Sequence, residues 1–150
     1  MAKQRDKIRM SEEEVAAFLD SSKSLNVATL DREGAPHLTT LWFARSGKDI
    51  LFETYGTSQK IVNLRRDPRI AVLCEQGEAY GELRGVSIQG KAEIVDSGPR
   101  LTQLMSLIID RSFPGQTPER LAQHVSDMIR KRVVVIVRPN RTMSWDHRKL

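Results

Sequence analysis

The chain is poor in cysteine and in long apolar runs. Cys74 is the only cysteine, so no internal disulfide can form. No apolar run approaches the roughly 20 residues that a membrane crossing requires. The basic N-terminal residues are followed by no apolar stretch of the kind that a secretion signal carries. We therefore expect a cytoplasmic protein with no membrane segment.

Aromatic residues are also scarce, at 5% of the 150 residues, and neither an RNP-type motif nor a zinc pattern is present. The net charge of +5 nevertheless favours an anionic ligand or partner. Because the basic residues are spread along the chain, nucleic acid is not the expected partner. His37 and His124 lack partners at metal-ligand spacing, so no metal site is expected. Cys74 lies in the apolar stretch "IAVLCE" and is interpreted as a small core residue, not a nucleophile.

The length is typical of a single domain, which we place at residues 1–150. Runs rich in β-branched residues between Gly, Asp and Lys turns predict antiparallel strands. These runs lie at residues 25–30, 36–44, 49–54, 69–75, 79–95, 133–139 and 142–146. Glycines 81, 85 and 90 within the longest run predict bulges or bends, which curl a sheet into a barrel.

Helical patterns surround these strands. Ser11 and Glu14 have capping-box spacing and open a helix at residues 11–20. Apolar residues at helical spacing predict a helix at 100–113, and Thr117 as cap with a following proline predicts another at 117–132. The element order, without alternating βαβ units, predicts a mainly β protein: a closed or nearly closed antiparallel barrel with peripheral helices.

The stretch "TSQKIVNLRRDP" carries the strongest chemical signal. If Thr57 or Ser58 caps a short helix, its free backbone N–H groups and positive dipole end lie beside two hydroxyls and the Lys60 ammonium. Such an arrangement binds phosphate. The alternative reading is a capped connecting helix with a solvated basic face.

The same helix has a predictable orientation. Ile61 and Leu64 would attach one side of it to the barrel. Lys60, Asn63 and Arg65 would then face outward or toward a groove.

Four segments together resemble a known family: "VATLDREGAPHLTTLWF" (27–43), "TSQKIVNLRRDPRIAVL" (57–73), "YGELRGVSIQGKAEIV" (80–95) and "SWDHRKL" (144–150). The chain resembles the pyridoxamine-phosphate-oxidase-like split β-barrel proteins, and among them the flavin/deazaflavin oxidoreductases of the B type, many of which use F420. The resemblance implies a six-stranded antiparallel FMN-binding split barrel. It also implies a homodimer with the cofactor in a groove between the chains.

The resemblance further implies a set of cofactor-binding residues. Those along the cofactor ring would be Thr39, Thr40, Leu41 and Trp42; those at or near its phosphate would be Thr57, Ser58, Lys60, Glu53, Thr54 and Asn63; and those reaching the groove from elsewhere would be Arg84 and Trp145. Other readings stay open: Trp42 as a core residue, Thr39 and Thr40 as simple strand formers, Arg84 as a solvated charge, and residues 145–149 as a frayed tail.

The implied activity is hydride transfer between reduced F420 and an electron-poor small molecule, with no catalytic residue assigned. A long basic groove would suit the oligoglutamate tail of F420, and its candidate residues are Lys60, Arg65, Arg66, Arg84 and 147–149. FMN is the alternative cofactor, because Thr57, Ser58 and Lys60 suffice for its compact phosphate. A pyridoxamine-phosphate oxidase proper is not expected, since the chain ends at "SWDHRKL" without an Arg/His-rich segment. The remaining alternative is a non-catalytic flavin- or haem-binding protein, with His37, His124 or His147 as axial ligand.

Overall fold

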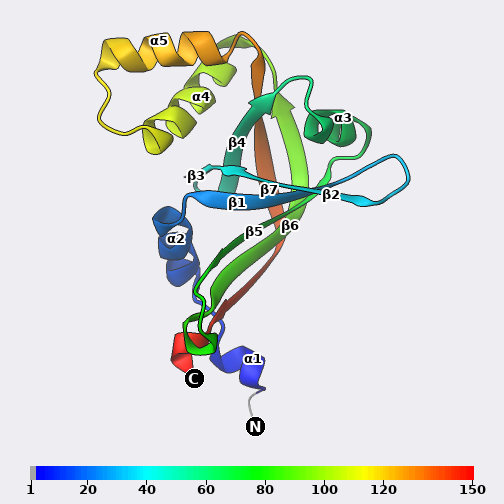
Figure 1. Ribbon diagram of the computed structural model, residues 1–150, viewed down its shortest axis with the longest axis vertical. Coiled ribbons are helices and arrows are strands. Elements are labelled where there is room, and N and C mark those ends of the chain that lie inside the picture. The colour runs from blue at the N-terminus through cyan, green and yellow to red at the C-terminus, as the bar shows by residue number, and fades with distance from the viewer. Residues whose placement is uncertain (1–2) are drawn as a thin grey trace.

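The computed structural model describes residues 3–150, which form one curled antiparallel sheet with helices on its periphery (Figure 1). The strands are β1 (Ser24–Leu30), β2 (Pro36–Trp42), β3 (Ala44–Ser46), β4 (Asp49–Tyr55), β5 (Arg69–Gln76), β6 (Arg84–Val95) and β7 (Arg132–Asp146), in the order β2-β1-β5-β6-β7-β4-β3. The helices are α1 (Gln4–Lys7), α2 (Glu12–Ser21), α3 (Gln59–Arg66), α4 (Gly98–Ser112) and α5 (Pro118–Met128), with 3-10 turns η1 (Tyr80–Glu82) and η2 (His147–Lys149). The expected mainly β fold with peripheral helices is confirmed.

Two parts of the expected strand pattern are divided or joined in the structure. The run expected at 36–44 is divided, because Phe43 between β2 and β3 is buried and its carbonyl accepts a hydrogen bond from the Arg111 guanidinium. This division accounts for seven strands where the resemblance implies six. The runs expected at 133–139 and 142–146 form the single strand β7, in which Pro139 is tolerated beside a register shift.

The glycines of the longest expected run have different roles. Gly81 lies in η1, so the strand begins only at Arg84. The pairing of β6 with β7 shifts register between Gln89 and Gly90, which confirms a bulge. A Cβ on Gly90 would lie 2.2 Å from the carbonyl oxygen of Arg138. Only glycine allows the two backbones to approach this closely.

The helix caps expected at Ser11 and Thr117 are confirmed. The Ser11 hydroxyl accepts the Glu14 N–H at 3.1 Å, and the Glu14 carboxylate accepts the Ser11 N–H at 3.2 Å. Thr117 accepts the Arg120 N–H at 3.3 Å at the start of α5. Helix α1 was not expected, because its four residues include no buried side chain and hence no apolar period. No helix in residues 3–150 is both long enough and apolar enough to span a bilayer.

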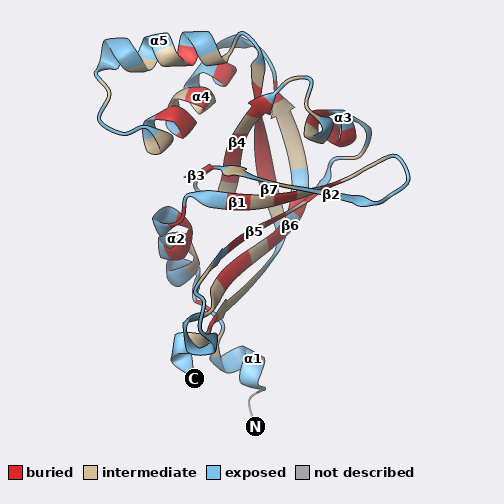
Figure 2. Cartoon of the chain, in the orientation of Figure 1, coloured by how far each residue is buried: buried red, intermediate tan, exposed pale blue. Residues whose placement is uncertain are grey.

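The core lies on both sides of β7, whose residues 133–137 are all buried (Figure 2). Val133, Val135 and Val137 join the cluster that includes residues of α2 and α3. Val134 and Ile136 join the cluster formed with α4 and α5. A strand covered on both faces has a continuous apolar sequence instead of an alternating one.

Gly90→Ala is expected to lower the free energy of unfolding by about 1–3 kcal/mol, the range for overpacking. The added methyl group would press on a backbone carbonyl, which cannot rotate away as a side chain can. Gly81→Ala is the matched control, because nothing lies within 4 Å of its added Cβ; its effect should stay within about 0.5 kcal/mol. Urea denaturation measures both changes, and equal midpoints for the two variants would contradict this account.

Candidate functional site

The chain after β4 places a helix N-terminus beside hydroxyl groups, as the sequence predicts. Ser58 is the N-cap residue of α3, but its hydroxyl does not cap the helix; it accepts a hydrogen bond from the Thr54 hydroxyl at 3.2 Å. In residues 3–150 no hydrogen bond engages the backbone N–H of Gln59 or Lys60. Thr57 lies exposed just before the cap. The first turn of α3 therefore keeps donors for an external acceptor at the positive end of the helix dipole.

Lys60 supplies a partly desolvated positive charge at this helix end. Burial lowers the pKa of its ammonium group, and the charge of Glu53 opposes that shift. Glu53 itself pairs with Arg132 at 2.9 Å, and the Arg132 guanidinium lies 3.9 Å from the centre of the Tyr55 ring. Within the described chain no carboxylate forms an ion pair with Lys60. An arriving anion would meet a cation that is not already neutralised.

Asn63 does not face outward, contrary to the sequence-based expectation. Its side chain is fully buried, its Nδ2 donates to the Thr29 hydroxyl at 3.0 Å, and its Oδ1 accepts from Gln59 at 2.8 Å. A buried amide must be hydrogen-bonded, and these bonds hold α3 on β1. Asn63 thus positions the helix that carries Lys60.

The four expected ring contacts of β2 lie on both sides of that strand. Thr39 and Leu41 are half-buried on the inner side, whereas Thr40 and Trp42 are exposed on the outer side. Thr40 donates to Asn26 Oδ1 at 2.7 Å. Trp42 is 47% exposed, which excludes the core reading for this residue in the chain. The alternation of side chains along a strand separates the two pairs.

Two polar atoms on the inner side of β2 are buried without partners: His37 Nδ1 and Thr39 Oγ1. An unpaired buried polar atom costs about 1–3 kcal/mol. Thr39 is one of the residues expected at the cofactor, and its hydroxyl has no hydrogen-bond partner in the described residues.

Arg84 and Trp145 lie at the opposite end of the molecule from α3, where β6 begins and β7 ends near the C-terminus (Figure 1). Arg84 donates to Gln76 Oε1 at 2.8 Å, and its guanidinium lies 5.3 Å from the centre of the Phe18 ring. The Trp145 indole packs directly over Gly85. One chain therefore does not bring these two residues to Lys60.

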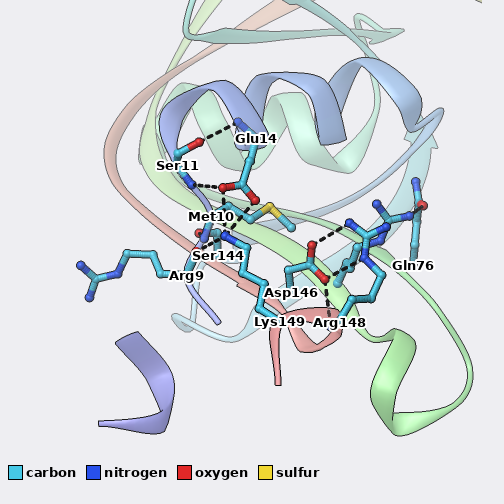
Figure 3. Close-up of polar contacts among 10 residues, drawn as sticks. Arg9, Met10, Ser11, Glu14, Gln76, Ser144, Asp146, Arg148 and Lys149 are labelled. Carbon is cyan, nitrogen blue, oxygen red and sulfur yellow. Dashed lines mark hydrogen bonds and ion pairs between the residues drawn. The ribbon is translucent and has the colours of Figure 1, made fainter. Parts of the chain in front are cut away.

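The C-terminal residues are tied to their own chain, so the frayed-tail reading is wrong (Figure 3). The buried Asp146 carboxylate accepts two hydrogen bonds from the Arg148 side chain, at 2.9 and 2.7 Å. Those hydrogen bonds lower the pKa of Asp146 against the opposing effect of burial. Lys149 donates to the Arg9 carbonyl and pairs with Glu14 at 2.8 Å.

The expected long basic groove is not assembled within one chain. Arg65 pairs with Asp96 at 3.4 Å, and Arg66 donates to the Leu30 carbonyl at 2.6 Å. The C-terminus lies at the opposite end of the molecule from α3 (Figure 1), and Arg148 and Lys149 bind their own chain there (Figure 3). Of the candidate cations for this groove, Lys60 is the one at the α3 N-terminus.

The three histidines lie on different elements. His37 is on β2; His124 on α5 packs 5.1 Å from the Phe113 ring; and His147 Nδ1 lies 2.8 Å from the Tyr80 carbonyl. The described residues contain no group of three His, Cys, Asp or Glu side chains placed to hold a metal.

Sequence reasoning missed Arg132 and Tyr55, which complete the charged cluster around Glu53. Tyr55 and Arg132 are direct partners in the β4–β7 ladder. The available signal was a basic residue just before the Val133 run, but its partner depends on a pairing between distant strands. No local pattern reveals that pairing.

A curled antiparallel sheet in the order β2-β1-β5-β6-β7-β4-β3, with helices on its periphery, defines a split-barrel protein. The sequence model described as "Pyridoxamine 5'-phosphate oxidase" matches residues 11–146, and the chain belongs to that family. No curated protein matches the chain.

Solved structures resemble it over most of its length. A conserved hypothetical protein, Rv2991 from Mycobacterium tuberculosis, is 45% identical, with a TM-score of 0.91 over 99% of this chain and 92% of that one. A protein named F420 reductase is 25% identical, with a TM-score of 0.62 over 84% and 93%. The haem storage protein HutZ from Vibrio cholerae shares the fold, at 15% identity and a TM-score of 0.69 over 89% of this chain and 94% of that one.

Cys74 is buried, as expected, and its thiol donates to the Ser24 carbonyl at 3.3 Å. Burial raises the pKa of this thiol from 9.0 to about 12. At pH 8 it is therefore protonated and shielded, and we expect no reaction with Ellman's reagent until the protein unfolds. The control is the same reaction in 6 M guanidinium chloride, where one thiol per chain should react. Rapid labelling of the native protein would contradict the assignment of Cys74 to the core.

Proposed function

We propose that this chain is an oxidoreductase that uses the deazaflavin F420 to transfer a hydride to or from an electron-poor small molecule. The observation that carries the proposal is the half-buried Lys60, which has no ion-pair partner in the described residues and lies beside open N–H groups of α3. Membership of the family supports it. So does the 25% identity to a structure named F420 reductase.

The residues at the α3 N-terminus fit the phosphate group of such a cofactor. The donors are the backbone N–H groups of Gln59 and Lys60, the hydroxyls of Thr57 and Ser58, and the Lys60 ammonium. Hydrogen bonds between these groups and a phosphate would be charge-assisted, and they would offset the cost of holding Lys60 partly out of water. Thr54 and Asn63 position the donors through their bonds to Ser58 and Thr29.

Strand β2 is suited to hold a flat ring along its free edge. It is the end strand of the sheet, so half of its backbone N–H and C=O groups have no strand to pair with. Those groups could bond the polar rim of a ring, and Thr39, Thr40, Leu41 and Trp42 are the side chains of this strand that would hold it. Thr39 has a buried hydroxyl without a hydrogen-bond partner on the inner side of this strand.

Bound F420 supplies the hydride chemistry, and the chain contributes binding, orientation and exclusion of water. The Glu53 carboxylate near Lys60 is paired with Arg132. We assign no acid or base catalyst.

The proposed active form is a homodimer with cofactor sites between the chains. Arg84 and Trp145 are too remote from Lys60 to act in the same site within one chain (Figure 1). A second copy could bring them to the α3 end of its partner. Exposed Leu38 and half-buried Leu73 and Ala28 give the outer face of β2, β1 and β5 an apolar character suited to such contact.

FMN is the second candidate cofactor, and one observation favours it. Arg65, Arg66 and Arg84, which were expected to hold an extended anionic tail, are engaged within the chain. The compact phosphate of FMN needs only the α3 donors. A haem-binding protein would instead show a Soret band on purification.

Lys60→Ala is expected to weaken the preferred cofactor by about 1.5–3 kcal/mol, the range for a hydrogen bond to a charged group. Fluorescence titration of purified protein with F420 and with FMN measures the change. Lys7→Ala is the matched control, because it removes the same charge from the exposed helix α1. Unchanged affinity in Lys60→Ala would remove this residue from the site, and no affinity of the wild-type protein for F420 or FMN would overturn the proposal.

A mixed dimer tests whether one site uses both chains. Lys60→Ala and Arg84→Ala homodimers should each bind cofactor weakly at both sites. A heterodimer of the two variants, purified through different tags, regains one complete site if Lys60 and Arg84 act from opposite chains. We therefore expect one tight cofactor per heterodimer by titration. Two weak sites would show that the residues do not act together across the interface, without affecting the Lys60 result.

A further inference from the structure

A second pocket, distant from α3, lies between the N-terminal helices, the turn joining β3 to β4, and the free edge of β7. Its volume is about 700 Å³, within the usual range for small-molecule sites. None of its described lining residues belongs to α3 or to the chain just before it, and in Figure 1 the helices α1 and α2, which help to line it, lie lower in the view than α3. The pocket is therefore separate from the site proposed for the cofactor.

The walls combine an apolar floor with a strongly cationic rim. Met10, Leu19 and Ile88 are buried side chains at its base. The cations that line it are Lys3, Arg5, Arg9, Arg45, Lys48 and Arg141. Glu12 is the one acidic residue among its described lining residues. A solvated basic face is the ordinary alternative, but such a face has no concave apolar base.

The charges of the rim are only partly neutralised. Arg9 pairs with Asp6, Arg45 with Asp20, and Lys48 with Glu12 at 3.7 Å. No carboxylate in residues 3–150 forms an ion pair with Arg5 or Arg141, and the Arg5 guanidinium donates to the Met143 sulfur at 3.2 Å. A thioether is a weak acceptor for a cation. These two arginines keep their capacity to bind an anion.

The edge of β7 adds backbone donors to the same pocket. Strand β4 pairs with β7 only up to Val137, so the later residues have a free edge. Asp146 donates its N–H across that edge to the Ile8 carbonyl at 2.7 Å. Because a strand repeats every two residues, Thr142 and Ser144 turn their N–H groups to the same side. Both residues line the pocket.

We propose that this pocket binds an organic polyanion, a small molecule with an apolar body and two or more phosphate or carboxylate groups. Arg5 and Arg141 bind the anionic groups, and the apolar floor receives the body. Arginine is suited to this task because its fork of N–H groups matches both phosphate and carboxylate oxygens. The site requires neither the cofactor nor Lys60.

Calorimetric titration at low ionic strength tests the proposal with ATP, trimesate (benzene-1,3,5-tricarboxylate) and adenosine. ATP or trimesate should bind and adenosine should not, and the tighter of the two anions distinguishes a phosphate ligand from a carboxylate ligand. Arg5→Ala/Arg141→Ala should weaken binding about tenfold or more. Arg32→Ala/Arg120→Ala is the control that removes the same charge from exposed positions elsewhere.

Lys60→Ala separates this pocket from the α3 site. Unchanged affinity for the polyanion in Lys60→Ala, together with the loss in Arg5→Ala/Arg141→Ala, supports the proposal. Loss of binding in Lys60→Ala alone would place the anion at α3 and overturn it. An equal loss in the Arg32/Arg120 control, or no binding of either anion to the wild-type protein, would also overturn it.

Discussion

Between Val133 and Val137, strand β7 has both faces covered, and the two halves of the core meet through it. One face packs on the side of α2 and α3, the other on α4 and α5. The same strand carries Arg132 to Glu53 at its start and leaves a free edge beside the N-terminal segment at its end. Both candidate sites therefore depend on the placement of one buried strand.

Charge in this protein is organised by pairing. Most arginines in the described residues bind a carboxylate or a carbonyl of their own chain, as Arg65, Arg66 and Arg148 do. The net charge of +5 is thus a poor guide to where an anion binds. The cations to which the two candidate sites are assigned form no ion pair in the described residues: Lys60 at the end of α3, and Arg5 and Arg141 at the second pocket. Because Lys60 is partly desolvated, its charge has the greatest need of an anionic partner.

The fold class and the α3 signal were predictable from sequence, whereas the assembly of the site was not. Period-two patterns marked most strands, and the serine and threonine caps marked the helix starts. The break between β2 and β3 at Phe43 was not predictable, because it depends on the distant Arg111. The continuity of β7 was not predictable either, because it depends on a bulge opposite Gly90. The prediction that Asn63 faces outward was wrong for a similar reason. Its partner Thr29 lies 34 residues away and becomes a neighbour only when α3 packs on β1.

The sequence by itself determined what depends on neighbouring residues: the caps at Ser11 and Thr117, the helix end beside Lys60, and the burial of Cys74 in an apolar strand. The tertiary structure alone decided which distant groups meet. Strand register paired Arg132 with Tyr55, and the free edge of β7 drew the N-terminal segment beside Ser144. The physical reason is that local patterns arise from backbone geometry within a few residues, whereas charge partners and pockets arise from long-range packing.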